Sequence, residues 1–344
     1  MAKPPLAELA AAGPPAEHFP APPDDALDVL PDAHRRAGPP ALPALDEATL
    51  SQHFADLAAV PGPTAWTAVE SRPALWHCHP AQPVATVQGL LEAAHEVARA
   101  LAALTGVERF SLQPPTLAAA ERAALAVARA AFARAESQRT EVVLPADGPV
   151  AAAQGLGLIV RQVPRLAEGD LDVDAVMDVV GPQAVAVVVS WLTPGGCFER
   201  NLLAAGEVAH ARGALLVADA SGLASLAGRT RLAEAGVDAC WLSLGELCPA
   251  ATTAAVGVRT SLTEFLPSPI LGKTREGYAL DDDLPGTIGR LAAAPAPAAD
   301  VLAAYAALVA LGDAGLRARG ARLALEAAAR ARGQPLARRP LASR

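Results

Sequence analysis

The chain has 344 residues, a formal net charge of -8 and a pI near 5.4. This length is enough for one large α/β domain or for two smaller ones. The acidic balance argues against nucleic acid as the main partner, because a phosphate backbone is bound by basic surfaces.

The cysteine and targeting patterns are typical of a cytoplasmic protein without a metal site. The four cysteines are widely spaced and form no C-x-x-C pair, which argues against a disulfide framework and a zinc finger. His77-Cys78-His79 has the residue types of a metal cluster, but no second ligand pair follows at a finger-like distance. We expect no signal peptide, since no basic region precedes an apolar core. We expect no membrane span either, because no segment reaches the roughly 20 apolar residues that one needs.

The first part of the chain predicts an arm ahead of the folded domain. Residues 1–45 are rich in Pro and Ala, and their proline pairs favour a flexible or partly polyproline segment. We assign residues 46–75 to a separate N-terminal segment between this arm and the folded domain. Helical spacing of apolar residues then predicts helices over 87–104 and 117–134.

An alternation of strands and helices follows, and it predicts a mostly parallel sheet with helices on both faces. Stretches with helical spacing, at 172–180, 202–212 and 229–235, separate most of the short β-branched runs. We assign this large α/β domain to residues 76–260. The predicted strands are 142–144, 158–160, 185–190, 215–218 and 239–244.

The remaining sequence predicts a loop-rich segment followed by helices. Residues 261–334 begin with several prolines and glycines, which favour turns. Two helices are predicted near 298–312 and 314–332, joined at Gly312-Asp313. Residues 335–344 are predicted to form a basic tail.

Short motifs follow one another in a fixed order over roughly residues 76–332. The motifs are His79-Pro80-Ala81-Gln82-Pro83, Thr86-Val87-Gln88-Gly89, Leu104-Thr105-Gly106, Ser111-Leu112-Gln113-Pro114, Gly196-x-Phe198-Glu199-Arg200-Asn201, His210-Ala211-Arg212-Gly213, Phe265-Leu266-Pro267-x-Pro269, Ile288-Gly289-Arg290 and Leu311-Gly312-x-x-Gly315-Leu316. They resemble those of glycine dehydrogenase (decarboxylating), the P-protein of the glycine cleavage system, and in particular its subunit 2. Each motif is weak alone, but the order and the spacing together make the resemblance specific.

The resemblance implies the large domain of a pyridoxal-phosphate-dependent transferase of fold type I, with a truncated C-terminal small domain. In that family an Asp after one strand holds the pyridinium nitrogen, and a Lys after a nearby strand forms the Schiff base. Asp219 matches the first position, whereas Glu246 occupies the position of the Schiff-base Lys. The chain has only two lysines, Lys3 and Lys273, and neither lies at that strand end.

The departures from the family pattern fall on the segments that would carry chemistry. The Gly-rich turn expected after Gln113-Pro114 is replaced by a segment that includes Pro115, which has no N–H, and Leu117, whose side chain hinders close approach of a phosphate. The other altered segments are Ala146-Asp147-Gly148-Pro149, Ser190-Trp191-Leu192-Thr193-Pro194, Asp219-Ala220-Ser221-Gly222, Gly245-Glu246-Leu247-Cys248 and the shortened stretch from Pro249 to Ala255.

Each candidate site residue has a structural alternative. Asp219 is either a vestigial cofactor residue or a carboxylate that caps a turn, for which Asp-Ala-Ser-Gly is suitable. Glu246 either points to solvent, or pairs with an arginine, or adds a second carboxylate beside Asp219 and so raises a pKa. Lys273 would have to reach in from a loop to replace the missing lysine. Cys248 has no neighbouring His or acid in sequence, and it therefore favours packing over nucleophilic chemistry.

Three functional hypotheses follow. The first is a catalytically degenerate homologue without cofactor or metal, which forms a homo- or hetero-oligomer, such as a dimer, with a glycine dehydrogenase subunit. The second is an active glycine dehydrogenase subunit that uses pyridoxal phosphate. The third is a binding module for another phosphate-bearing small molecule. Whether Trp191, Leu192 and Leu247 fill the pocket separates these hypotheses.

Overall fold

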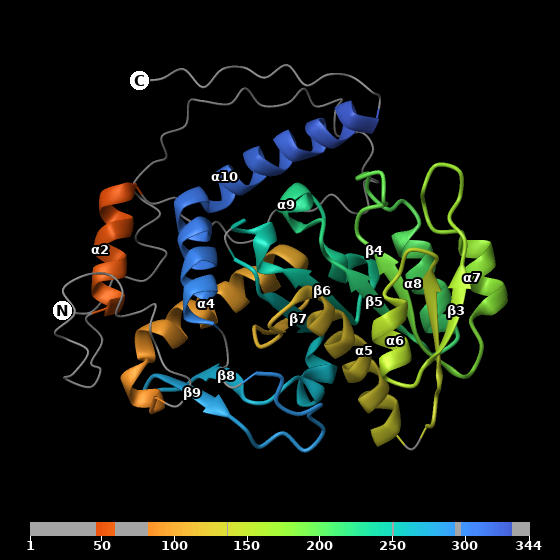
Figure 1. The fold of residues 1–344 in the computed structure, drawn as a ribbon, viewed down its shortest axis with the longest axis horizontal. Helices are drawn as coiled ribbons and strands as arrows, with labels where there is room; N and C mark the ends of the chain where they lie inside the picture. Colours follow the sequence, from red (N-terminus) through yellow and green to blue (C-terminus); the bar gives the residue numbers. More distant parts are fainter. Residues whose placement is uncertain (1–45, 59–81, 136, 250, 293–296, 332–344) are drawn as a thin grey trace.

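A computed structural model describes residues 46–58, 82–135, 137–249, 251–292 and 297–331 (Figure 1). The predicted arm at 1–45, the His77-Cys78-His79 cluster and the tail at 335–344 lie outside these residues. So do the first three residues of the motif that begins at His79.

A seven-stranded sheet forms the centre of the fold, with the strand order β1-β7-β6-β5-β4-β2-β3. Strand β7 runs antiparallel to both of its neighbours, and the pairs from β6 through β3 are parallel. This confirms the predicted mostly parallel sheet. The strands are β1 (Arg109–Ser111), β2 (Glu141–Pro145), β3 (Ile159–Val163), β4 (Ala184–Ser190), β5 (Leu215–Asp219), β6 (Ala239–Ser243) and β7 (Ala254–Val258).

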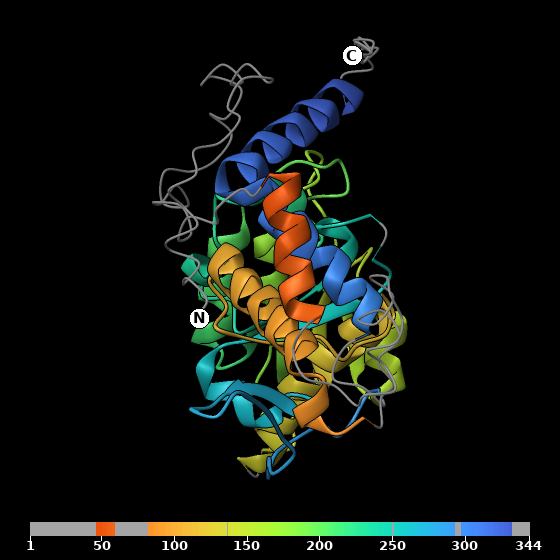
Figure 2. The ribbon, with the colours of Figure 1, turned by 90° about the vertical axis from the view of Figure 1, so that its left-hand side faces the viewer.

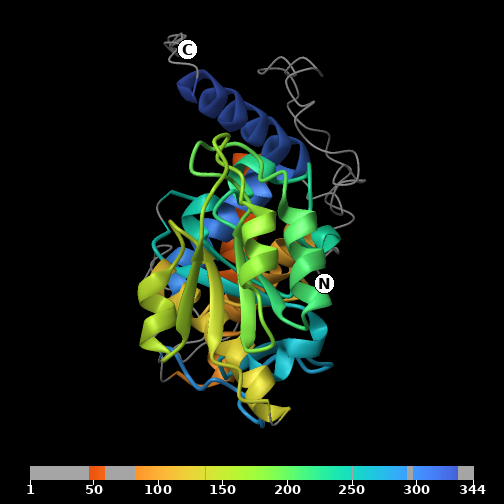
Figure 3. The ribbon, with the colours of Figure 1, turned by 90° about the vertical axis from the view of Figure 1, so that its right-hand side faces the viewer.

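Helices cover both faces of the sheet, which explains why its strands are apolar throughout. In β4 the six residues before Ser190 are all buried, and its alternate side chains enter two separate core clusters. Figure 3 shows α7 (Val173–Val179) and α8 (Leu202–Ala211) on one face, and α5 (Leu117–Arg134) and α6 (Val150–Gly155) on the other. Helix α5 has the bounds that the apolar spacing predicts.

Helix α10 (Ala298–Ala331) crosses the molecule on the side of α4 (Gln88–Thr105), and α2 (Glu47–Ala58) lies beside both (Figures 1 and 2). Its backbone is non-helical at Gly312, where two helices were predicted to join. The stretch Ala298–Glu326 is long and apolar enough to cross a membrane by length and composition, so the sequence-based test for spans was too strict. Packing of this helix on α4 and on α9 (Leu223–Leu226) accounts for its apolar residues.

Three parts of the fold differ from the prediction. The loop-rich segment contains a hairpin of β8 (Ile270–Lys273) and β9 (Tyr278–Asp281), and the short strand β1 was not predicted. The helix expected at 229–235 is only a 3₁₀ turn, Leu232–Ala235. The conformation of these segments depends on contacts with distant residues, which a local sequence pattern does not show.

Two glutamines of the family motifs, the half-buried Gln88 and the buried Gln113, connect segments that are far apart in the sequence. The Gln88 side chain donates to the Tyr278 carbonyl and accepts from the Tyr278 N–H, both at 2.8 Å, and so fixes β9 against α4. Gln113 donates to the carbonyls of Pro267 and Pro269 and accepts from the Leu291 N–H. These landmarks therefore stabilise the fold.

Candidate functional site

The carboxyl ends of the parallel strands gather the candidate residues at one edge of the sheet. Ser190, the last residue of β4, pairs with Asp219, the last residue of β5. Asp219 in turn pairs with Trp241 in β6, and Glu246 follows in the 3₁₀ turn Leu244–Glu246. Ligands of open parallel sheets bind at this edge, so the chemistry of these side chains decides what the edge can hold.

Asp219 accepts hydrogen bonds from its own turn. Its Oδ1 accepts from the Ser221 N–H at 2.9 Å and from the Ser221 hydroxyl at 2.5 Å. Burial raises the pKa of Asp219, the two Ser221 bonds oppose that rise, and the negative charge of Asp147 adds to it. Asp219 therefore has the turn-capping partners of the structural alternative while it remains at the strand end.

Glu246 does not lie free in solvent. It is half-buried, and its Oε2 accepts from the Ala224 N–H in α9 at 3.1 Å. Burial raises the pKa of Glu246; the bond from Ala224 and the charge of Arg319 oppose that rise, and Asp219 reinforces it. The carboxylate thus stabilises a backbone turn at the position where the family resemblance implies a lysine.

A third carboxylate, Glu121 in α5, belongs to the same edge and was not singled out from the sequence. Burial raises its pKa, and the negative charge of Asp219 raises it further. The group of ionisable side chains at this edge is therefore mainly acidic. An acidic edge is unfavourable for a bound phosphate.

We expect Glu121→Gln to stabilise the protein at neutral pH by roughly 0.5 kcal/mol. A carboxyl whose pKa is higher in the folded chain favours folding only below its unfolded pKa, near 4.5, and this contribution is lost as the pH rises through the folded pKa. The gain from the substitution should therefore vanish below pH 4.5. Urea unfolding at both pH values measures it, with the exposed Glu207→Gln as the control. Equal gains at both pH values would contradict this explanation.

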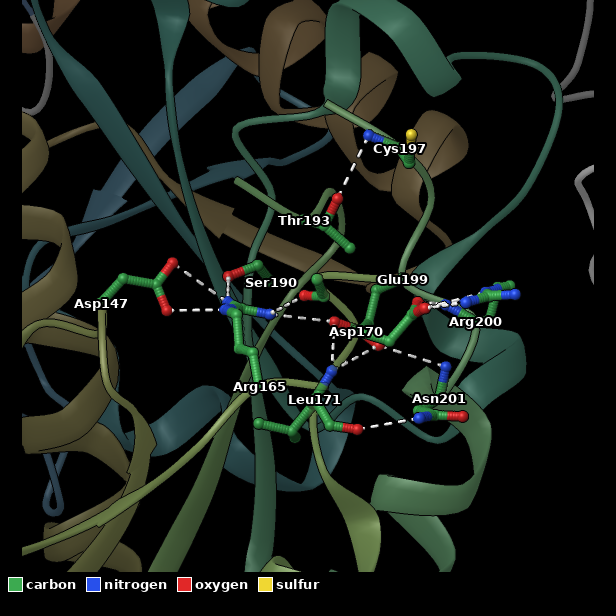
Figure 4. Close-up of polar contacts among 11 residues, drawn as sticks. Asp147, Arg165, Asp170, Leu171, Ser190, Thr193, Cys197, Glu199, Arg200 and Asn201 are labelled. Carbon is green, nitrogen blue, oxygen red and sulfur yellow. Dashed lines mark hydrogen bonds and ion pairs between the residues drawn. The ribbon is translucent and has the colours of Figure 1, made fainter. Parts of the chain in front are cut away.

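Arg165 links the loops at this edge, as Figure 4 shows. Its Nε and Nη2 donate to the two carboxylate oxygens of Asp147 at 2.7 and 3.2 Å. Nη1 donates to Glu199 Oε2 at 3.1 Å and to the Gly169 carbonyl, and Nη2 also donates to the Ser190 hydroxyl at 3.3 Å. Only 12% of the Arg165 side chain is exposed. A single guanidinium therefore joins the segments that follow β2, β3 and β4.

The Glu199-Arg200-Asn201 motif has structural roles in this arrangement. The Glu199 side chain is fully buried and accepts from the N–H groups of Leu171 and Asn201. Burial raises the pKa of Asp170, but hydrogen bonds and charge from Arg200 outweigh this and hold it below its usual value. The Asn201 side chain donates to the Leu171 carbonyl at 2.8 Å.

A residue of the preceding turn, Thr116, caps the N-terminus of α5. Thr116 is the N-cap, and its hydroxyl accepts from the Ala119 N–H at 3.2 Å. A helix N-terminus binds a phosphate through such unpaired N–H groups. Part of the donor set that would hold a phosphate is therefore used internally, and Pro115 contributes no N–H at all.

Apolar side chains occupy the neighbouring space. Trp191 and Leu247 are buried. A Cβ on Gly222 would lie 2.6 Å from the Leu192 side chain, so Leu192 packs directly against the turn that follows Asp219. Trp191 and Leu247 therefore belong to the core, and Leu192 packs beside the strand end of Asp219.

Lys273 lies elsewhere in the molecule. It is exposed at the end of β8, with its ammonium 5.6 Å from the centre of the Tyr278 ring. In Figure 1 the β8–β9 hairpin lies below the sheet and α9 lies above it. Among the described residues, no group of three or more His, Cys, Asp or Glu side chains could hold a metal ion. Cys248 is half-buried and is not part of a disulfide.

Sequence reasoning missed Arg165 and Asp147 as well as Glu121. The first two directly follow strands, and the rule that ligands lie at strand ends could have selected them. No local signal identifies Glu121, because it lies in the first turns of a helix and approaches Asp219 only through the packing of α5 on the sheet.

The strand order and the single antiparallel strand next to β1 define the fold as that of the pyridoxal-phosphate-dependent enzymes of fold type I. The glycine decarboxylase (P-protein) of the glycine cleavage system, solved in an inhibitor-bound form, superposes with a TM-score of 0.58 and is 21% identical, covering 89% of this chain and 71% of that one. No family profile matches the sequence.

Similarity in sequence to known proteins shows the family of this chain. The probable glycine dehydrogenase (decarboxylating) subunit 2 of Nitrosococcus oceani is 30% identical over 325 residues, which cover 86% of this chain and 67% of that protein. The same protein of Thermus thermophilus is 30% identical over 292 residues, which cover 77% and 62%. The chain therefore belongs to the glycine dehydrogenase (decarboxylating) subunit 2 family. It spans about two thirds of the length of these relatives.

The described side chains do not fit pyridoxal phosphate. Glu246 cannot form an imine, and its carboxylate is engaged with Ala224. Thr116 already caps the N-terminus of α5, and the carboxylates of Glu121 and Glu246 near Asp219 are unfavourable for a bound phosphate. We therefore derive no chemical step through this cofactor.

Proposed function

We propose that this chain is a non-catalytic member of its family that acts as a structural or regulatory partner of a glycine dehydrogenase subunit. The observation that carries this proposal is Glu246, whose half-buried carboxylate accepts a backbone hydrogen bond where catalysis needs an amine. The side chains that fill the strand-end edge support it as well. In this proposal the protein works without bound pyridoxal phosphate.

The partner role is supported by the names of the relatives and by the retained framework. The relatives are described as a subunit 2, that is, as one part of a larger assembly. The family motif residues Gln88 and Gln113 make hydrogen bonds to distant backbone groups, and these bonds stabilise the family fold even though the site is altered. A fold retained without its catalytic groups is suited to binding another chain.

Incubation of the pure protein with pyridoxal phosphate, followed by borohydride and peptide mapping, is expected to give no stoichiometric pyridoxyl-lysine. The reason is that Lys273 lies at the end of β8 in the β8–β9 hairpin, with its ammonium 5.6 Å from the centre of the Tyr278 ring, whereas Asp219 ends β5 of the central sheet. The variant Lys273→Arg is the control for surface labelling. A stoichiometric adduct at Lys273 that protects the protein against thermal unfolding would refute the proposal.

A second measurement addresses the alternative of an active subunit. Exchange of labelled bicarbonate into glycine should stay at background when the chain is mixed with a glycine dehydrogenase subunit 1. Co-purification of the two chains at a fixed stoichiometry would support the partner role. Exchange above background that is lost in Asp219→Asn would instead favour an active enzyme.

A further inference from the structure

Arg165 covers the part of the edge beside Asp219. Its Nη2 is 3.3 Å from the hydroxyl of Ser190, the residue paired with Asp219 across β4 and β5. Its bidentate partner Asp147 lies near enough to Asp219 to raise the pKa of Asp219. The ion pair therefore lies beside the strand end that carries Asp219.

The guanidinium of Arg165 pairs with two carboxylates, Asp147 and Glu199, and offsets one of their two negative charges. The pair with Glu199 is shielded from water, because the Glu199 side chain is fully buried. The donors of the Arg165 guanidinium have several acceptors: two carboxylates, one hydroxyl and one carbonyl. A bridge with this number of partners is held in place without any contribution from residue 246.

We propose that the Asp147–Arg165–Glu199 bridge is an internal lock that closes the ligand edge, as a barrier separate from the loss of the lysine. Restoring the amine alone would then leave the edge closed. This inference rests on the proposed function, since it explains how the degenerate site is kept filled. It adds a second barrier at this edge, besides the absence of a lysine at position 246.

The test uses the full chain and free pyridoxal with borohydride as a probe of lysine accessibility. In Glu246→Lys the new amine should react slowly. In Glu246→Lys combined with Arg165→Met, the labelling rate at position 246 should rise roughly tenfold or more, because the charged bridge is gone. The matched control combines Glu246→Lys with Arg161→Met, which removes the exposed pair between Arg161 in β3 and Glu141 in β2. It should not alter the rate.

Equal labelling rates in the single and the double variant, whether both fast or both slow, would overturn the lock. If Arg165→Met prevents folding, Asp147→Asn replaces it, since that change leaves the pair with Glu199 intact. The wild-type chain separates the two proposals. An adduct at Lys273 counts against the proposed function, whereas fast labelling of Glu246→Lys alone counts only against the lock.

Discussion

Replacing Glu199 by alanine is expected to lower the free energy of unfolding by about 3–5 kcal/mol. The carboxylate is fully buried and accepts from Arg165 and from the N–H groups of Leu171 and Asn201. Its removal leaves a mostly buried guanidinium and two N–H groups without this acceptor. Urea unfolding measures the change, provided that the slope with denaturant stays constant.

Two controls define this result. Glu199→Gln keeps one oxygen acceptor and the volume of the side chain, so it should cost less than Glu199→Ala, although its amide NH2 replaces one of the two acceptor oxygens. Glu207→Ala, on the exposed side of α8, should change the stability by no more than about 0.5 kcal/mol. A loss for Glu199→Ala as small as that for Glu207→Ala would mean that the bridge contributes little.

Replacing Trp191 by alanine is expected to cost about 3–5 kcal/mol, because a large cavity would open in the core beside the strand ends. The side chain is fully buried in the cluster on the α8 face of the sheet. Its indole nitrogen has no hydrogen-bond partner in the described part of the chain. Trp191→Phe should therefore cost much less than Trp191→Ala, since no hydrogen bond is lost.

Trp241 is the matched control for this comparison. It is also buried, and its indole nitrogen likewise lacks a partner within the described ranges. Trp241→Phe should therefore be as mild as Trp191→Phe in urea unfolding. A large cost for Trp191→Phe alone would show that its indole N–H is bound in solution, for example by a buried water.

An element could be predicted from the sequence when the residues that stabilise it lie within the element itself. Helix α5 was predicted with its observed bounds because its apolar spacing runs over 18 residues. Strand β1 has only three residues, and it exists because Phe110 packs on Gly257 of β7, where a Cβ would meet its ring at 2.4 Å. The β8–β9 hairpin depends in the same way on Gln88, which lies 190 residues earlier than Tyr278.

The sequence by itself determined which groups are present at the ends of the strands. Asp219 closes a β-branched run and Glu246 stands where the family has its lysine, and both facts follow from order and spacing alone. Only the tertiary structure decided where these carboxylates point. Glu246 turns to the Ala224 N–H, and Arg165 joins Asp147 and Glu199, which are 18 and 34 residues away. The physical reason is that an ion pair depends on distance in space, and parallel strands bring distant residues to one edge.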